Sequence, residues 1–259
     1  MTAISDQKDA RTPAGPMDPV LQARDLKMFF GGVAALRGVS FSVGQDEILG
    51  LIGPNGSGKS TLVNCLSGVL SPSAGEVVFY GTVVTGWSRA RRARAGLVRS
   101  YQNLRLFPSL SVNENLAAGF FAGRQGSPRP LAQVTADWAQ RLGLAEHRET
   151  MVSALSFGHQ RRTEIGRTLI GEPKVVLLDE PAAGLDTGER ANLGHLLDGF
   201  RAERSCSIVV IDHDMSFISQ LCDRVIVLRS GSIIFDGTPS DALNDAAVVE
   251  AYLGEVDGA

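Results

Sequence analysis

The stretch GPNGSGKST at positions 53–61 constrains the fold of this chain more than any other segment. It stands between an apolar run at 48–52 and a stretch in which apolar residues recur at positions 62, 65, 66 and 69. This order predicts a strand, a glycine-rich loop and a helix. Because glycine lacks a Cβ and adopts positive φ readily, the loop can point successive backbone N–H groups into one concavity that suits an anion.

Other residues of the same loop add charge and a metal ligand. We expect the helix to begin near Lys59 and to contribute the unpaired N–H groups and the positive dipole of its first turn. The Lys59 ammonium adds a formal charge, and the Ser60 hydroxyl is placed to ligate a magnesium ion. The pattern therefore predicts that the chain binds a nucleoside triphosphate, and the alternative is a chance match in a glycine-rich turn.

Composition is compatible with one large α/β domain or two small ones. The chain has 259 residues, and 44% of them are hydrophobic, which is enough to bury a sizeable core. No run approaches the roughly 18 apolar residues that cross a bilayer, and no secretion signal is visible, so we expect a cytosolic protein. A net charge of −3 gives no general reason to bind nucleic acid. The three widely spaced cysteines lie in apolar surroundings, which indicates reduced core thiols: Cys65, Cys206 and Cys222.

Periodicity divides the chain into segments. Residues 1–18 mix proline, glycine and charge without periodicity, which predicts a flexible N-terminal tail before a domain at 19–259. Helical spacing predicts a helical subdomain at roughly 103–160. Short strand-like pieces between glycine turns predict an antiparallel layer, at 21–30, 39–43 and 76–81. Later segments predict mostly parallel buried strands, a hairpin through 230–231 and one closing helix at 239–254.

Two acids follow the apolar strand predicted at 175–178. Burying Asp179 and Glu180 there would cost several kcal/mol each without compensation, and ligands of open α/β sheets bind at the carboxyl ends of strands. We therefore expect a bound magnesium ion to compensate the charge of Asp179. Glu180 is expected to polarise a water that attacks the terminal phosphate. The alternative is that Asp-Glu-Pro simply ends a strand. His213 follows the next strand and should project from the same edge, although a lone histidine is more often structural.

A further motif, LSFGHQRR at 155–162, gives these residues a family context. Together with the glycine loop, the strand end LLDE, GLD at 184–186 and the histidine after the next strand, it resembles the ATP-binding subunits of ABC transporters. The resemblance covers residues 20–259. It implies ATP hydrolysis with ATP and Mg²⁺ as cofactors. It also implies an α/β P-loop NTPase fold with a mostly parallel RecA-like core sheet, an antiparallel β subdomain and a helical subdomain.

The resemblance also implies a role for each matching residue. ATP would be held by the loop residues Gly53, Pro54, Asn55, Gly56, Ser57, Gly58, Lys59, Ser60 and Thr61. Ser60, Gln102 and Asp179 would serve the metal, and Gln102 would also report to the membrane partner. Glu180 would be the general base, His213 would contact the γ-phosphate, and Asp186 would belong to a loop that crosses to a second ATPase subunit.

Two residues of the motif at 155–162 are expected to act on the second subunit. By resemblance, Ser156 and Gly158 contact the γ-phosphate bound by the partner ATPase, and we expect a helix to open just after Gly158. His159 stands where the family more usually has glutamine or another residue, and the sequence retains Ser156 and Gly158. Near the N-terminus, Phe30 is expected to stack on adenine while Phe29 packs into the core, because adjacent strand residues point to opposite faces.

Longer stretches narrow the resemblance to the LivG type of ATPase subunit in branched-chain amino acid importers. They include RSYQNLRLFPSLSVNENL at 99–116 and the ending at 237–255. This implies a second ATPase subunit, with an unlike partner favoured over a second copy of this chain. It also implies two membrane permease subunits and an external substrate-binding protein, at the cytoplasmic face of the inner membrane. Importers of urea or short amides are an alternative, and a soluble ABC ATPase acting on nucleic acid or ribosomes is a weaker one. We interpret the basic stretch at 89–99 as a solvated face, or a surface near lipid headgroups or the partner.

Overall fold

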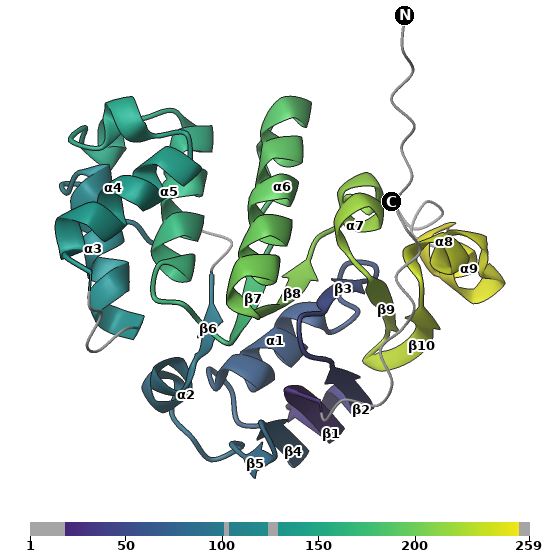
Figure 1. The fold of residues 1–259 in the computed structure, drawn as a ribbon. Coiled ribbons are helices and arrows are strands. Elements are labelled where there is room, and N and C mark those ends of the chain that lie inside the picture. Colours follow the sequence, from purple (N-terminus) through teal and green to yellow (C-terminus); the bar gives the residue numbers. More distant parts are fainter. Residues whose placement is uncertain (1–18, 101–103, 124–128, 254–259) are drawn as a thin grey trace, which may run out of the picture.

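The computed structural model describes residues 19–100, 104–123 and 129–253, which form two β-sheets and surrounding helices (Figure 1). The tail expected at 1–18 lies outside the described residues. Within the described ranges, no helix is both long and apolar enough to cross a membrane.

An antiparallel sheet is built from the first strands, in the order β2-β1-β4-β5. Its long hairpin turns at two glycines, residues 31 and 32, that both have positive φ. Buried and exposed residues alternate along much of β1 and β2, as expected for strands with one covered face. The strands are β1 (Leu21–Phe30), β2 (Val33–Val43), β4 (Ala74–Phe79) and β5 (Thr82–Val83).

The second sheet has six strands in the order β10-β9-β3-β8-β7-β6. Only the β9–β10 pair is antiparallel, and the other four pairs are parallel. All residues of β3, β7 and β8 are buried, which explains their continuous apolar sequences. The strands are β3 (Ile48–Ile52), β6 (Leu97–Arg99), β7 (Val175–Asp179), β8 (Ser207–Ile211), β9 (Arg224–Arg229) and β10 (Ser232–Gly237).

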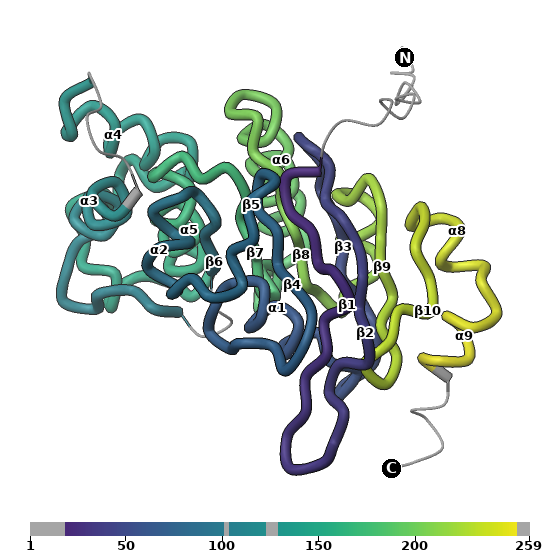
Figure 2. Tube along the Cα trace, turned by 90° about the horizontal axis from the view of Figure 1, so that it is seen from below, coloured from purple at the N-terminus to yellow at the C-terminus, as the bar shows by residue number. Residues whose placement is uncertain are grey.

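The helices cover both faces of this sheet. Figure 1 shows α1 between the two sheets, and Figure 2 shows the antiparallel strands passing over that face. The helices α3, α4 and α5 gather at one side of the molecule, and where a helical subdomain begins and ends stays a prediction. The helices are α1 (Lys59–Ser67), α2 (Arg89–Ala95), α3 (Val112–Gly123), α4 (Leu131–Arg141), α5 (Phe157–Leu169), α6 (Thr187–Arg204), α7 (Met215–Leu221), α8 (Pro239–Asn244) and α9 (Ala246–Leu253).

Two hydrophobic clusters flank the six-stranded sheet. Along β3, Ile48 and Ile52 belong to one cluster and Leu49 and Leu51 to the other, so alternate side chains feed opposite faces. The predicted core thiols are confirmed, because all three cysteines are buried and free. Burial raises the pKa of Cys65 to about 11 and that of Cys206 to about 12.

The C-terminal segment differs from the prediction of one closing helix. The structure has two helices, α8 and α9, that meet at Asp245. The Asp245 carboxylate accepts the backbone N–H groups of Ala247 at 2.9 Å and Val248 at 3.0 Å, so it starts a new helix instead of continuing the first. The hairpin expected through residues 230–231 is confirmed, and both residues have positive φ.

The basic stretch at 89–99 is not simply a solvated face, so that interpretation is wrong for part of it. It forms α2 and β6, and Arg92 is only 1% exposed. Its guanidinium donates to the carbonyls of Cys65 at 2.8 Å and Leu66 at 2.6 Å, which lie in the last turn of α1. The buried arginine thus supplies donors to carbonyls at the end of a helix, where the backbone alone cannot satisfy all acceptors. Arg89, Arg91 and Arg94 are exposed, as expected.

Candidate nucleotide-binding site

The predicted loop at 53–61 joins β3 to α1, and its three glycines have positive φ. The values are 142° for Gly53, 73° for Gly56 and 107° for Gly58. A Cβ on Gly53 would lie 2.2 Å from the carbonyl oxygen of Leu228, and one on Gly58 would lie 2.7 Å from that of Ala35. Packing therefore excludes side chains at both ends of the loop, whereas Gly56 faces open space.

Donors gather at this loop. The Lys59 ammonium donates to the carbonyl oxygens of Gly53 at 2.5 Å and Pro54 at 2.8 Å, which folds the side chain back over the loop. The Ser57 hydroxyl is buried and has no hydrogen-bond partner among the described residues. Helix α1 begins at Lys59, as predicted, with no side-chain cap on its first turn. A polyphosphate fits here, because it would supply acceptors to the orphaned hydroxyl and to the helix N-terminus.

At the end of β7, the charge of Asp179 is compensated by a residue of the chain. Its Oδ2 lies 2.6 Å from Nη2 of Arg99, and both side chains are nearly buried. Arg99 also donates to Oδ1 of Asn64 in α1, at 2.5 Å. The last residue of β6 therefore compensates this charge in the structure, and compensation by a magnesium ion stays a prediction. Arg99 thus ties β6, β7 and the helix of the phosphate loop together.

The chemistry of the nearby side chains still suits magnesium. The Ser60 hydroxyl is exposed at the start of α1, and Asp179 supplies carboxylate oxygen at the sheet edge. At nucleotide sites Mg²⁺ binds hard oxygen ligands and keeps several of its own water ligands, so two protein ligands are sufficient. The third expected ligand, Gln102, lies outside the described residues.

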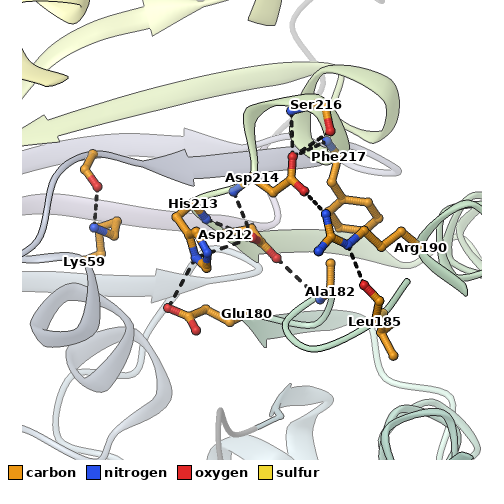
Figure 3. Close-up of polar contacts among 11 residues, drawn as sticks. Lys59, Glu180, Ala182, Leu185, Arg190, Asp212, His213, Asp214, Ser216 and Phe217 are labelled. Atoms are coloured by element: carbon orange, nitrogen blue, oxygen red, sulfur yellow. Dashed lines mark hydrogen bonds and ion pairs between the residues drawn. The ribbon is translucent and has the colours of Figure 1, made fainter. Parts of the chain in front are cut away.

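Glu180 and His213 face each other at the carboxyl ends of β7 and β8 (Figure 3). Oε1 of Glu180 lies 3.8 Å from Nδ1 of His213, whose side chain is 70% exposed. The Glu180 backbone has φ 47°, and its N–H donates to the carbonyl of Ile211 at 2.7 Å. This left-handed conformation is unusual for glutamate and reverses the chain directly after the strand. The sequence prediction that both side chains leave the same sheet edge is confirmed.

The motif at 155–162 forms the start of α5, two residues earlier than expected. Ser156 is the N-cap, and its hydroxyl accepts the N–H of His159 at 3.3 Å. Ser156 is exposed, whereas Gly158 is buried. A Cβ on Gly158 would lie 2.0 Å from Oε1 of Glu189, so a side chain at that position would displace the carboxylate of Glu189.

Asp186 lies on the surface at the start of α6. It forms a capping box with Glu189, in which Oδ1 of Asp186 accepts the N–H of Glu189 at 2.8 Å. The reciprocal bond, from the N–H of Asp186 to Oε2 of Glu189, measures 3.2 Å. The same glutamate therefore contacts Gly158 and caps the loop that carries Asp186.

Both phenylalanines at the tip of the first hairpin are exposed. Phe29 is 50% exposed and Phe30 is 46% exposed, so the expectation that Phe29 packs into the core is wrong. A register shift in the pairing of β1 with β2 between Met28 and Phe29 breaks the strict alternation on which that expectation rested. Phe30 is available for a stacking contact with a base, and that role stays a prediction.

Sequence reasoning missed four residues that support this site. Arg99 was hidden in a run of arginines that resembles a surface. Asp212 and Asp214 flank His213 on either side, and Arg190 forms an ion pair with Asp214. The sequence signal for Asp212 and Asp214 was their position directly after a buried strand. The same kind of position identified Asp179 and Glu180 at the end of another strand.

Comparison with known sequences supports the resemblance to the ATP-binding subunits of ABC transporters. A family model described as "ABC transporter" matches residues 36–183, and one described as "Branched-chain amino acid ATP-binding cassette transporter" matches residues 232–258. The chain is 38% identical to the high-affinity branched-chain amino acid transport ATP-binding protein LivG of Salmonella typhimurium, over 92% of this chain and 98% of that protein. It is 35% identical to BraF of Pseudomonas aeruginosa with the same coverage.

Solved structures agree with the fold. An ATP-binding cassette of an ABC transporter in its ADP conformation superposes with a TM-score of 0.83 at 29% identity, over 92% of this chain and all of that one. The protein cbiO1 of Clostridium perfringens, part of an ABC transporter complex, gives a TM-score of 0.79 at 28% identity, over 93% of this chain and 98% of that one. The predicted P-loop NTPase fold is confirmed, and this chain belongs to the ABC transporter family as an ATP-binding cassette ATPase.

Proposed function

We propose that this chain binds and hydrolyses ATP to drive the import of branched-chain amino acids through a membrane permease. The observation that carries the proposal is the phosphate loop with its orphaned Ser57 hydroxyl, in the same site as the Glu180–His213 pair. Support for the substrate class comes from the match of residues 232–258 and from relatives whose names specify branched-chain amino acid transport.

Each step of hydrolysis can be assigned to groups of this chain. Backbone N–H groups of the loop and Lys59 bind the β- and γ-phosphates, and Ser57 donates its hydroxyl hydrogen. Glu180 accepts a proton from the attacking water, and His213 holds the γ-phosphate in line. Ser60, Gln102 and Asp179 would hold Mg²⁺, which neutralises developing charge on the phosphate oxygens when it is bound. Phe30 stacks on the adenine ring.

A second ATPase subunit would complete the site. Ser156 and Asp186 are both exposed at helix N-termini, and in this proposal they face the nucleotide and loops of the partner. Gly158 shares this task through the backbone N–H groups of the first turn of α5. We favour an unlike partner, because the resemblance is to importers with two different ATPase subunits.

The permease is expected to dock at a cavity of about 550 Å³ between α2, α3 and the end of α5. Its lining combines the apolar Phe107 and small residues of α3 with several cations and a single acid, Glu172. The cations are Arg94, Arg99, Arg105, Arg167 and Lys174. This chemistry suits a helix with small apolar residues and acidic side chains. The subunit would then lie at the cytoplasmic face of the membrane, and an external binding protein would deliver the substrate.

The test uses the transporter assembled in vesicles from this chain, its partner ATPase, the permease subunits and the external binding protein. Glu180→Gln should lower ATP turnover by roughly 10²- to 10⁴-fold, because the general base is lost, while ATP still binds. Leucine uptake should fall in parallel, as measured with radiolabelled leucine.

The matched control is Glu250→Gln, which changes an exposed acid on α9. It should leave both rates unchanged. Full turnover in Glu180→Gln would reject the assignment of the base. Uptake of urea or a short amide, with none of leucine, would favour the alternative substrate class, and retention of RNA or DNA at high salt would favour a nucleic-acid role.

A further inference from the structure

Two neighbouring loops carry the side chains proposed for hydrolysis. The first, residues 180–186, follows β7 and begins with Glu180, and the second, residues 212–214, follows β8 and contains His213. Because β7 and β8 are paired in parallel, the loops leave the sheet side by side. Contacts between the loops therefore determine how Glu180 and His213 stay aligned.

Asp212 makes the first of these contacts. Its side chain is 1% exposed, and Oδ1 accepts the N–H groups of His213 at 2.8 Å and Asp214 at 3.0 Å. Its Oδ2 accepts the N–H of Ala182 across the gap between the loops, at 3.4 Å. A buried carboxylate is stable only when its acceptors are satisfied, so these backbone donors must stay in place for both loops at once.

An ion pair makes the second contact. Nη1 of Arg190, in the first turn of α6, pairs with Oδ2 of Asp214, and Nε of Arg190 donates to the carbonyl of Leu185 at 3.0 Å (Figure 3). Oδ1 of Asp214 caps α7 by accepting the N–H groups of Ser216 at 2.9 Å and Phe217 at 3.2 Å. One carboxylate thus connects the helix after the first loop to the helix after the second.

We propose that Asp212, Asp214 and Arg190 form a clamp that positions Glu180 and His213 relative to each other. None of the three needs to touch the nucleotide, so they are positioning residues. The N–H of Arg190 also donates to the carbonyl of Asp186 at 2.9 Å. A partner subunit that displaces Asp186 therefore shifts Arg190, and through the clamp it shifts His213. The inference rests on the proposed function, because it concerns the alignment of that catalytic pair.

A double-mutant cycle in the assembled transporter tests the clamp. Asp214→Asn keeps a good N-cap for α7 but removes the charge, and Arg190→Gln removes the other partner. Each variant should lower kcat for ATP hydrolysis by roughly 10-fold to 100-fold, because small misplacements of catalytic groups are costly. The KM for ATP should change by less than about two-fold, because the loop that binds the phosphates is untouched. The double variant should be no slower than the slower single one.

Matched controls come from an ion pair between α4 and α6. Arg141 and Glu203 pair at 2.7 Å, away from both loops, and Arg141 is about as exposed as Arg190. Arg141→Gln and Glu203→Gln should leave kcat unchanged. Ser216→Ala, which removes the 2.6 Å bond from the serine hydroxyl to Asp214 but keeps the ion pair, should also leave kcat unchanged.

The outcomes separate this inference from the proposed function. If the wild-type transporter hydrolyses ATP, either of two results would overturn the clamp alone. In the first, both single variants keep the wild-type kcat. In the second, the losses of kcat in the two single variants multiply in the double variant. A fall in melting temperature without a fall in kcat would reduce the contacts to a structural role and would also overturn it. Absence of ATP turnover in the wild-type transporter would overturn both proposals. Binding of a fluorescent ATP analogue to each purified full-length variant checks that the phosphate loop is intact.

Discussion

At the scale of single residues, the glycines of the phosphate loop serve different needs. Gly53 and Gly58 have positive φ, and each also lies against a backbone carbonyl that a Cβ would meet at less than 3 Å. Gly56 has positive φ but no close neighbour, so glycine is required at this position only for its backbone conformation. The sequence predicts the conformational need of all three, but the packing of two of them depends on β2 and β9, which no local pattern reveals.

Arg99 offers a prediction at the same scale. Replacing Arg99 by alanine leaves the Asp179 carboxylate buried without its cation, which should lower the free energy of unfolding by about 3 to 5 kcal/mol. Arg94→Ala, in the same basic stretch but exposed, should change it by less than about 0.5 kcal/mol. Urea denaturation measures both changes in the free energy of unfolding. Equally small changes in the two variants would show that the ion pair does not contribute to stability.

Some site residues could be predicted from the sequence because local rules locate them. Asp179, Glu180 and His213 stand at the ends of apolar strands, and parallel strands bring their carboxyl ends to one edge. Arg99 could not be assigned this way. Its partner Asp179 lies 80 residues away in the chain, so only the folded sheet brings the two groups together. Asp212 also stands at a strand end, but its bond to Ala182, 30 residues away, depends on the folded sheet as well.

At the scale of elements, the contact between α5 and α6 links the two motifs proposed to face a second subunit. Glu189 caps α6 and lies against Gly158 in the first turn of α5. Strand and helix types were predicted well where helical spacing was long, as in α3, or where an apolar run was continuous, as in β8. The missed elements include α2 and β6, because seven and three residues are too few for a periodic signal and their arginines suggested a surface.

Alanine at position 158 tests this contact. The new Cβ would lie 2.0 Å from Oε1 of Glu189, and that side chain cannot retreat without losing its bond to Asp186. Gly158→Ala should therefore lower the free energy of unfolding by about 1 to 3 kcal/mol. Gly199→Ala, in α6 with no neighbour within 4 Å, should instead raise it by roughly 0.5 to 1 kcal/mol. Chemical denaturation decides, and a stabilised Gly158→Ala variant would contradict the packing argument.

At the scale of the whole molecule, ATP should stabilise the folded chain, because the proposed site forms only when the loop and the hairpin tip are folded. At ATP concentrations near 100 times Kd, the gain should be about 2.7 kcal/mol. Lys59→Ala removes charge-assisted hydrogen bonds to phosphate and should abolish most of this gain at the same concentration. Lys174→Ala, just before β7 at the opposite end of the strand from Asp179, should keep it. Thermal melts with and without ATP and magnesium measure the difference, and equal shifts in the two variants would exclude Lys59 from the site.

The three buried thiols have a practical consequence. Their pKa values are raised well above neutral pH, and none of them is exposed, so alkylating reagents should spare the native chain. A single new cysteine on the surface could then carry a spectroscopic label without removal of the native ones. Distances between two labelled cassettes would report directly on opening and closing during turnover.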